Sequence, residues 1–390
     1  MEPWDATLAR IDREAAAERG AALFGATRPP QFVSVGANLV FRLTRADGAS
    51  AYLKLIHARL RDRAEVEANA AYHAHLFDGG APVPPALQSV EGRRVETFDV
   101  AGEPVVATAA RAVPGRSAEP RPAEYAAWGR ALASMHAVAE SFPKAVAAPL
   151  RHWQANWREC VEQIRPDDAR ALAEVERVEA WLRELPRDAG ALGMTHSDCN
   201  RTNALYDGGR VRIIDFDEPM HHWFAADVAR PFRELTHEDP AFEACRAALV
   251  AGYREVRALD DRLEQAIPGF VRMKNVEIYA WIAHRGHWTG DELPGGRDRK
   301  AVFDAIVPYF PVLKRLGASA IASFIDGVRN QDWSRIDRDL YAEMTEVERD
   351  ALSAKVLLDA RAAVKAAYEA NRQWQQDLLR LTLRLVLSVI

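Results

Sequence analysis

Residues 196–203 read His-Ser-Asp-Cys-Asn-Arg-Thr-Asn, and residues 215–217 read Asp-Phe-Asp after a short apolar stretch. An Asp, an Asn five positions later and a second Asp beyond a hairpin can hold a hydroxyl group, a metal ion and a nucleoside triphosphate together. In this layout Asp198 faces the hydroxyl group, while Asn203 and Asp215 bind the metal. Mg²⁺ prefers oxygen ligands and often takes only one or two protein carboxylates, so this pair suffices. The spacing predicts a phosphoryl-transfer site.

The chain between the two motifs has the pattern of a β-hairpin. Two apolar runs, residues 204–206 and 211–214, flank the Asp-Gly-Gly at residues 207–209. A turn signal between short apolar runs is typical of a hairpin. Such a hairpin returns Asp215 to the side of Asn203. His, Asp and Asn also cap ordinary turns, but three polar positions in register with a hairpin favour the catalytic interpretation.

Residues 196–217 resemble the catalytic loop of the aminoglycoside phosphotransferase and choline kinase family, in which a small residue such as Ser197 replaces the arginine of protein kinases. The stretch from Trp128 to His136 resembles the helix before that loop, and Asp227-Val228-Ala229 resembles a helix start that follows the metal-binding Asp. Such landmarks cover most of residues 30–335. The arrangement is most similar to homoserine-kinase-type enzymes and to a bacterial stress-response kinase that phosphorylates protein Ser and Thr. The resemblance implies an α+β, bilobal, protein-kinase-like fold that uses ATP and Mg²⁺.

The pattern of residues 31–56 predicts strands at 32–35, 39–43 and 51–56, separated by Gly36-Ala37-Asn38 and Asp47-Gly48. Lys54 falls on the third strand. In the kinase layout a third-strand Lys contacts the α- and β-phosphates, and a loop between the first two strands covers the triphosphate. We expect Ser34, Gly36 and Asn38 in that covering loop, which holds one Gly rather than a full G-x-G-x-x-G.

A helix is predicted at residues 61–77, ended by Gly79-Gly80 and a Pro-rich loop. In the family this helix carries the acid that pairs with the third-strand Lys. Glu67 is the expected partner of Lys54 and Glu65 is the alternative, although the family's usual spacing falls nearer Asn69. Either Glu is otherwise part of a solvated helix face.

Strands near residues 87–90, 95–98 and 104–109 complete the predicted antiparallel sheet. The resemblance places adenine after the last strand, against backbone groups near Ala110 and Ala112. Regular apolar spacing at 125–136 and 168–185 then predicts packed helices. We therefore expect a nucleotide-binding lobe at 1–110 and a helical lobe with the acceptor site at 111–338.

The tail at residues 339–390 extends beyond the resemblance. Residues 345–348 read Thr-Glu-Val-Glu, a capping-box pattern, and apolar residues then follow one helical face up to Tyr368. This pattern predicts a helix for docking or for a homodimer. From residue 379 apolar residues alternate with polar ones as in a strand, so this end is packed, paired with a second subunit or foreign to the native protein.

The composition, with 390 residues, 48% hydrophobic and 27% charged, indicates a globular chain with a large core. A net charge of −5 gives no electrostatic reason to expect nucleic acid. Three scattered cysteines indicate neither a disulfide framework nor a zinc site, and we interpret Cys199 as a packing residue. Residues 1–20 lack a secretory signal and no run has the length of a membrane span. A cytoplasmic enzyme without a membrane partner is expected.

The leading interpretation is a phosphotransferase acting on a hydroxyl group of a small molecule, such as an aminoglycoside or an amino alcohol. The acceptor can be cationic, because aromatic side chains at 221–224 and 279–288 and the acids Glu218, Glu234, Glu238 and Asp239 suit an amine. Core packing is the more frequent role of such aromatics. A protein Ser/Thr kinase of the stress-response type is the alternative, although no A-P-E ending follows Asp215. The third interpretation is a regulator that binds nucleotide without catalysing a reaction. It is motivated by the tail and by the nonstandard phosphate loop.

Overall fold

The structure is a computed structural model. It describes residues 4–35, 37–164, 166, 169–188, 190–233, 235, 240–286, 305, 309–316, 320, 323–324, 327, 332–352, 357–359 and 361–362. The chain forms two compact units, Met1–Glu277 and Ile278–Ile390. The first unit holds the predicted nucleotide-binding lobe and the larger part of the predicted helical lobe, and the predicted boundary at residue 338 falls inside the second unit.

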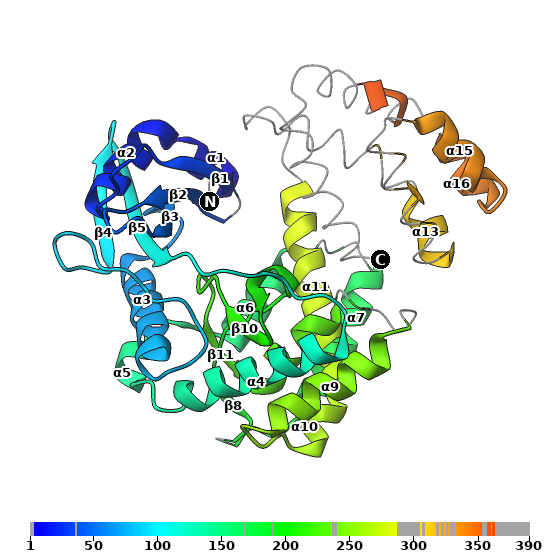
Figure 1. Ribbon diagram of the computed structural model, residues 1–390. Coiled ribbons are helices and arrows are strands. Elements are labelled where there is room, and N and C mark those ends of the chain that lie inside the picture. The colour runs from blue at the N-terminus through cyan, green and yellow to red at the C-terminus, as the bar shows by residue number, and fades with distance from the viewer. Residues whose placement is uncertain are drawn as a thin grey trace. The chain divides into compact units, whose positions relative to one another are not determined.

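A five-stranded antiparallel sheet opens the first unit, drawn in blue to cyan in Figure 1. Its strands are β1 (Gln31–Val35), β2 (Leu39–Thr44), β3 (Ser50–His57), β4 (Val95–Val100) and β5 (Glu103–Arg111), in the spatial order β1-β2-β3-β5-β4. The tight turn between β2 and β3 requires Gly48, whose φ is +74°. These strands confirm the predicted antiparallel sheet.

The strand predicted at residues 87–90 is wrong. In the described structure this segment forms no strand. Ala86, just before it, makes an isolated bridge to Ala110, and the amides of Leu87 and Val90 donate to the carbonyls of Ala109 and Leu23 at 2.8 and 2.9 Å. Prolines at 82, 84 and 85 lack amide donors and interrupt the ladder before it can form. The Ser89 amide turns instead to the Arg93 carbonyl, 2.7 Å away, so the chain here is a turn.

Helices cover both faces of the sheet. On one face α1 (Trp4–Ala9) and α2 (Arg13–Leu23) pack over a buried cluster that includes Leu53 and Leu55 of β3. On the other face α3 (Arg63–Asp78) packs through Val66 against Ile56. Side chains alternate along a strand, so Lys54 points to the side of α3 with Ile56. The helix predicted at 61–77 is α3, and it begins where the Asp62 side chain accepts the Ala64 amide at 3.0 Å.

The rest of the first unit is mainly helical (Figure 1). Its elements are β6 (Arg116–Ser117), α4 (Pro122–Ala139), α5 (Lys144–Ala147), β7 (Arg151–His152), α6 (Trp153–Glu162), α7 (Ala169–Glu184), β8 (Leu192–Thr195), η1 (Arg201–Asn203), β9 (Ala204–Asp207), β10 (Arg210–Ile213), β11 (Met220–Trp223), α8 (Phe224–Ala229), η2 (Arg230–Arg233), α9 (Phe242–Arg254) and α10 (Asp261–Gln265), followed by α11 (Ile267–Gly286), which continues past residue 277. The helices predicted at 125–136 and 168–185 are α4 and α7.

Two small sheets hold the motif segments. One has the order β10-β9-β6 and the other β7-β11-β8. The predicted hairpin is the antiparallel pair β9 and β10, in which Ala204 pairs with Ile213. Its turn residues Gly208 and Gly209 have φ values of +54° and +87°, the left-handed conformations that a two-residue hairpin turn favours. The hairpin prediction is confirmed.

In the second unit the structure describes α13 (Phe310–Leu316), α15 (Trp333–Tyr341) and α16 (Glu346–Leu352). The predicted capping box is present at the start of α16, where the Thr345 amide donates to Glu348 at 2.7 Å and the Glu348 amide donates to the Thr345 hydroxyl at 3.3 Å. The alternating segment from residue 379 lies outside the described residues, and dimerisation through the tail stays a prediction.

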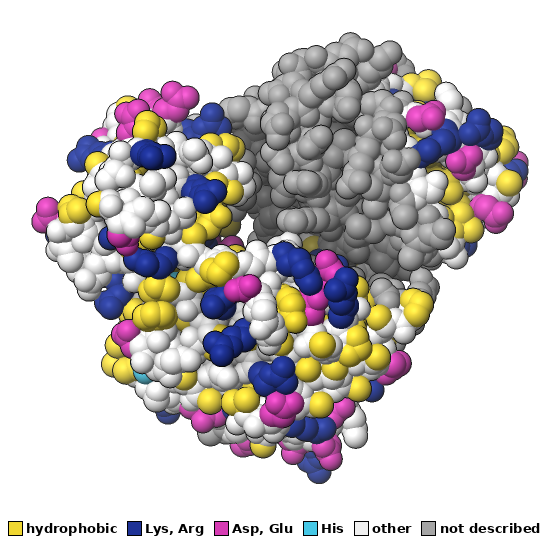
Figure 2. Space-filling model, in the orientation of Figure 1, with side chains coloured by type: hydrophobic (Ala, Val, Ile, Leu, Met, Phe, Trp, Pro, Cys, Tyr) yellow, Lys and Arg dark blue, Asp and Glu magenta, His cyan; other side chains and the backbone are white. Residues whose placement is uncertain are grey.

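The described surface shows no segregation of charge on the face in Figure 2, where basic side chains lie among acidic and apolar ones. Among the helices that the structure describes, none has both the length and the apolar character needed to span a bilayer.

Candidate active site

The catalytic loop follows β8 and is fastened by a buried carboxylate. Asp227 accepts the amides of His196 and Ser197, both at 2.7 Å, and lies 3.0 Å from Nε2 of His136. Burial alone would raise the pKa of Asp227, but the hydrogen bond and charge of His136 outweigh it and lower that pKa. Ser197 has a φ of +67°, a strained value for a residue with a side chain. Asp227 therefore maintains a loop conformation that the backbone alone disfavours.

Asp198 lies in this loop with its carboxylate bound to a buried arginine. Nε and Nη2 of Arg230 donate to Oδ1 of Asp198 at 3.1 and 2.8 Å, and Arg230 is 7% exposed. Burial favours the neutral acid, yet the charges of Arg230 and Lys274 lower the pKa of Asp198. Asp198 is therefore a carboxylate at neutral pH, as an acceptor of a hydroxyl proton requires.

Sequence reasoning did not identify Arg230 as part of the site. The feature of the sequence that could have identified Arg230 is its position three residues after Asp227. Asp227 lies in α8, and Arg230 begins η2, which follows α8 directly. Because this spacing puts both side chains on one helical face, the buried Asp227 holds the loop while Arg230 reaches the carboxylate.

Asn203 and Asp215 meet at the base of the hairpin. The Asn203 side chain donates its amide to the Asp198 carbonyl at 2.9 Å, and its Oδ1 has no hydrogen-bond partner among the described residues. The Ile214 amide donates to the Asn203 carbonyl at 2.9 Å, which brings Asp215 alongside. Asp215 has a φ of +75°, a second strained position in the site. The structure thus brings Asp198, Asn203 and Asp215 together.

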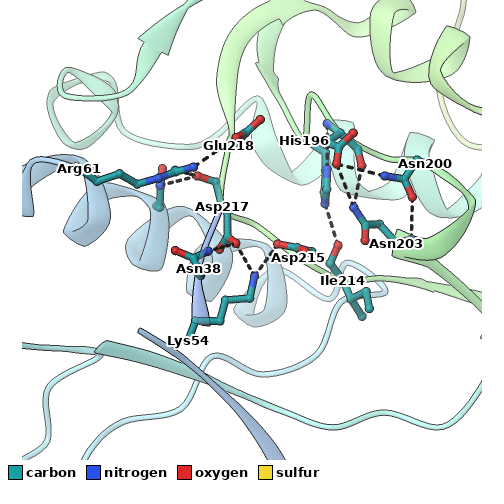
Figure 3. Close-up of polar contacts among 12 residues, drawn as sticks. Asn38, Lys54, Arg61, His196, Asn200, Asn203, Ile214, Asp215, Asp217 and Glu218 are labelled. Carbon is teal, nitrogen blue, oxygen red and sulfur yellow. Dashed lines mark hydrogen bonds and ion pairs between the residues drawn. The ribbon is translucent and has the colours of Figure 1, made fainter. Parts of the chain in front are cut away.

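Lys54 reaches this cluster from β3. Its Nζ is ion-paired with Oδ1 of Asp215 and with Oδ2 of Asp217, the latter at 2.7 Å (Figure 3). Burial would lower the pKa of Lys54, but the two carboxylates raise it. Burial and the charge of Asp217 raise the pKa of Asp215 to about 7. Burial also acts on Asp217, but Lys54 and Arg61 lower its pKa to about 2. Lys54 therefore stays protonated between the two carboxylates, of which Asp217 is the stronger acid.

The predicted pairing of Lys54 with Glu67 is wrong in this structure. Glu67 instead pairs with Arg63 at 2.8 Å on the exposed side of α3, and Glu65 lies 3.7 Å from Arg61. The side of α3 that faces the site carries Val66, Asn69, Ala70 and His73. This is the spacing of one helical face, and residue 67 lies off it.

A cavity of about 420 Å³ lies beside Lys54, a size within the range of small-molecule sites. Asn38 lines it from the β1–β2 connection and Ser34 from the end of β1, whereas Gly36 lies outside the described residues. Their part in covering phosphates stays a prediction. The apolar lining of the cavity comes from both the sheet and the helical part of the unit: Val40, Ile56, Val66, Val106, Leu205 and Ile214. Such a slot suits a flat aromatic base.

The predicted adenine contacts near Ala110 and Ala112 stay a prediction, and the backbone donors there differ in availability. Ala110 and Ala112 both line the cavity, but the Ala112 amide already donates to the Ser50 carbonyl at 2.9 Å. Pairing of β5 with β3 thus extends one residue past the end of the strand and uses that donor. The Val113 amide has no hydrogen-bond partner among the described residues, and Val113 also lines the cavity.

A second, smaller depression adjoins the catalytic loop. Lys274 and Glu277, neighbours on α11, pair at 3.1 Å on its wall, and Glu277 also accepts the Asn156 side chain at 3.0 Å. Its described lining further includes Ser197, Met220, His222, Ala226, Ala229, Arg230, Arg233, Phe270, Val271 and Met273.

The predicted cation-binding aromatics and acids do not form one group in the described structure. Trp223 is fully buried and packs 4.6 Å from the Trp153 ring, and Phe224 is 1% exposed, so both fill core volume. Glu218 pairs with Arg61 at 3.3 Å. Glu234, Glu238 and Asp239 lie outside the described residues, as do the side chain of Tyr279 and all the side chains of residues 281–288. A cationic acceptor stays a prediction.

Cys199 has the packing role that the sequence indicated. Its sulfur is fully buried and accepts the indole N–H of Trp128 at 3.2 Å. Burial raises the pKa of this thiol well above its ordinary value. A buried, protonated thiol is a poor nucleophile.

The donor set around Asp215 suits a hard cation. The described residues hold no cluster of three or more His, Cys, Asp or Glu side chains. What the site offers is the Asp215 carboxylate and the Asn203 amide oxygen, a small all-oxygen set of the kind that Mg²⁺ completes with water and phosphate oxygens.

Known proteins with the same arrangement are phosphotransferases. Residues 31–264 match the sequence profile described as the phosphotransferase enzyme family (APH). The amicoumacin kinase of Bacillus subtilis (strain 168) is 24% identical over 65% of this chain and 79% of its own. A homoserine kinase of Nitrobacter winogradskyi is 34% identical over 40% of this chain and 49% of its own. The solved structure of amicoumacin kinase hAmiN in complex with AMP-PNP, Ca²⁺ and Ami superposes with a TM-score of 0.65 at 22% identity, over 73% of this chain and 90% of that one.

The profile match spans more than half of the chain and includes β1, Lys54, the catalytic loop and the 215–217 motif. The superposition extends the likeness to the α+β, protein-kinase-like fold. The chain therefore belongs to the phosphotransferase enzyme family.

Proposed function

We propose that this enzyme transfers the γ-phosphoryl group of ATP to a hydroxyl group of a small molecule with the help of Mg²⁺. The observation that carries the proposal is a chain of contacts among four side chains. Lys54 is ion-paired with Asp215 on the wall of the cavity, and Asn203, whose carbonyl accepts the amide of the residue before Asp215, donates its side chain to Asp198. These four side chains come from β3, the catalytic loop, η1 and the end of a hairpin, and each has the chemistry that one part of phosphoryl transfer needs.

On the donor side, the apolar slot accepts the base and the Val113 amide offers it a hydrogen bond. Lys54 lies on the wall of the same cavity and supplies a positive charge for the α- and β-phosphates. Asn203 and Asp215 would hold Mg²⁺, which would neutralise the negative charge of the β- and γ-phosphates. When the nucleotide enters, Lys54 exchanges its contact with Asp215 for phosphate oxygens.

On the acceptor side, Asp198 orients the hydroxyl group and takes its proton. The hydroxyl oxygen forms a bond to the γ-phosphorus while the bond from that phosphorus to the ADP oxygen breaks. Arg230 keeps the Asp198 carboxylate charged and in place through two hydrogen bonds to one oxygen. The second oxygen accepts from neutral side-chain amides, Asn200 at 3.1 Å and Asn203 at 3.3 Å, and is the one we assign to the substrate hydroxyl.

The acceptor binds in the depression beside Asp198, between the catalytic loop and α11. The relatives are named for amicoumacin and homoserine, which supports a small polar molecule with an amino group and a hydroxyl group. The described lining offers Glu277 for an amine and Lys274 for an anionic group, so the charges match those of a hydroxy amino acid, which carries both an ammonium and a carboxylate group.

The test is a phosphorylation screen with purified protein, labelled ATP and Mg²⁺. The panel holds amino alcohols, hydroxy amino acids, aminoglycosides and sugars, with a whole-cell protein extract as the opposing arm. We expect label in one class of small molecule and stoichiometric ADP. Label confined to protein would contradict the small-molecule assignment, and ADP release without any labelled product in either arm would contradict phosphoryl transfer to a hydroxyl group.

A further inference from the structure

The helix that packs behind Lys54 presents no acid to it. The α3 residues lining the cavity are Val66, Asn69, Ala70 and His73, and the acids of the same helix pair elsewhere. Asn69 is 7% exposed and donates its side-chain amide to the Asp217 carbonyl at 3.0 Å. A charged amine in a buried position needs a carboxylate partner, so that partner comes from another element.

Asp217 is fastened from several sides. Its Oδ2 accepts the Asn38 side chain at 2.5 Å and lies 2.7 Å from Lys54. Its backbone carbonyl accepts both the Arg61 guanidinium and the Asn69 side chain. Figure 3 shows Asn38, Lys54 and Arg61 converging on this residue from the β1–β2 connection, from β3 and from the segment before α3. Side chains from the sheet, from the segment before α3 and from α3 itself thus all hold Asp217 in place.

Asp215 has fewer anchors. Its side chain is 41% exposed against 25% for Asp217, and its described side-chain partners are Lys54 and Asp217. Asp215 is also the carboxylate that the proposed function gives to the metal. When Asp215 turns to the metal and the phosphates, Asp217 remains as the fixed partner of Lys54.

We propose that Asp217 is the positioning residue that holds Lys54 toward the phosphates of the nucleotide, in place of an acid on α3. The inference deepens the proposed function and rests on it for the identity of the ligand. It also assigns Asn38 a role, because this residue joins the β1–β2 connection to the same carboxylate.

The test is a double-mutant cycle on the full chain with the variants Lys54→Met, Asp217→Asn and their combination. Calorimetry measures the dissociation constant of ATP with Mg²⁺. We expect Asp217→Asn to weaken binding roughly ten- to a hundredfold, the range for losing a hydrogen bond to a charged group. In the Lys54→Met background the same change should weaken binding less than about twofold, because Asp217 then has no amine to position. Asp217→Glu, which keeps the charge, should restore part of the affinity.

Glu67→Gln is the matched variant, since it removes one carboxylate charge from the exposed side of α3 and should leave affinity within about twofold. If the Asp217→Asn effect persists in the Lys54→Met background, Asp217 acts on the metal or the loop and the inference is overturned. A loss of affinity in Glu67→Gln equal to that in Asp217→Asn overturns it as well.

Urea unfolding of the same four proteins without nucleotide separates this inference from the proposed function. We expect each single variant to unfold at a lower urea concentration than the wild type. The double variant should unfold at a urea concentration no lower than that of the less stable single variant. Wild-type protein that binds no ATP would overturn the proposed function, and the ion-pair inference would then be decided by the unfolding cycle alone. Additive shifts in that cycle would contradict it.

Discussion

At the scale of single residues, burial sets the charge state of the groups around the active site. His73 and His222 are buried, and burial lowers the pKa of each to about 4. Both are therefore neutral at physiological pH, where the Trp223 amide can donate to Nδ1 of His222 at 2.8 Å. The acids behave differently, because basic partners keep Asp198 and Asp227 charged despite burial. The site thus combines neutral histidines with ionised carboxylates.

This difference predicts how stability depends on pH. The pKa of His222 falls from 6.5 in the unfolded chain to about 4 in the folded protein. Its contribution to stability is complete above pH 6.5 and is lost as the pH falls toward 4, because only the unfolded chain takes up the proton. Replacing His222 by Phe removes this loss, which amounts to roughly 3 kcal/mol over that interval.

The measurement is the free energy of unfolding in urea at several pH values between about 7 and 4. The variant also loses the acceptor for the Trp223 amide, which shifts its curve by a constant. The two slopes are therefore compared rather than the absolute values. Equal slopes for wild type and His222→Phe would show that this histidine is protonated in the folded protein.

Sequence spacing predicted the return of Asp215 to the side of Asn203, because a hairpin fixes where the chain comes back. The roles given to Lys54, Asp198, Asn203 and Asp215 stay predictions. The Lys54 partner was not predictable in the same way. Asp217 and Glu67 are both acids near the expected position, and the choice between them depends on the rotation of α3 about its axis. Arg230 was missed for a similar reason, since its contact with Asp198 depends on how η2 packs.

At the scale of elements, α4 and α9 pack closely against each other in the helical part of the first unit. Gly129 of α4 and Gly252 of α9 are the contact points. A Cβ added to Gly129 would overlap the Leu249 carbonyl oxygen, and one added to Gly252 would overlap the Ala126 carbonyl oxygen. Both obstacles are backbone atoms, which cannot move aside without separating the helices.

We expect Gly129→Ala to destabilise the protein by roughly 3 kcal/mol or more, although alanine is the better helix former. Gly20→Ala in α2 is the matched control, because its new Cβ would meet the flexible Leu53 side chain at 3.0 Å. Thermal unfolding of both variants measures the difference. A Gly129→Ala protein as stable as the control would mean that α4 and α9 do not pack this closely.

Regular elements were predictable where periodicity and capping agreed. The helices α3, α4 and α7 and the β9–β10 hairpin lie where the pattern placed them, and the capping box at Thr345 forms as its spacing indicates. The failure at residues 87–90 has a local cause, since the prolines before it supply no amide for a ladder. The Ala112 amide is used by one extra pair between β3 and β5, a register detail that periodicity does not contain.

At the scale of the whole molecule, the residues to which we assign catalysis belong to one compact unit. Met1–Glu277 holds the sheet, the cavity and the catalytic loop, and the family match ends at residue 264 within it. The boundary at residue 277 lies inside α11, where apolar spacing continues without a break, and sequence alone offers no signal for it. The unit boundary depends on contacts between distant segments, which is why the sequence pattern placed it elsewhere.

The central claim is that Asp198 acts on the acceptor hydroxyl and not on the nucleotide. The most direct measurement compares wild type with Asp198→Asn for two quantities, the turnover of the acceptor found in the screen and the dissociation constant of ATP with Mg²⁺. We expect turnover to fall by a factor of at least about 10², the scale of a lost general base, with nucleotide affinity unchanged within about twofold. Turnover near the wild-type rate, or a loss explained entirely by weaker ATP binding, would contradict the account.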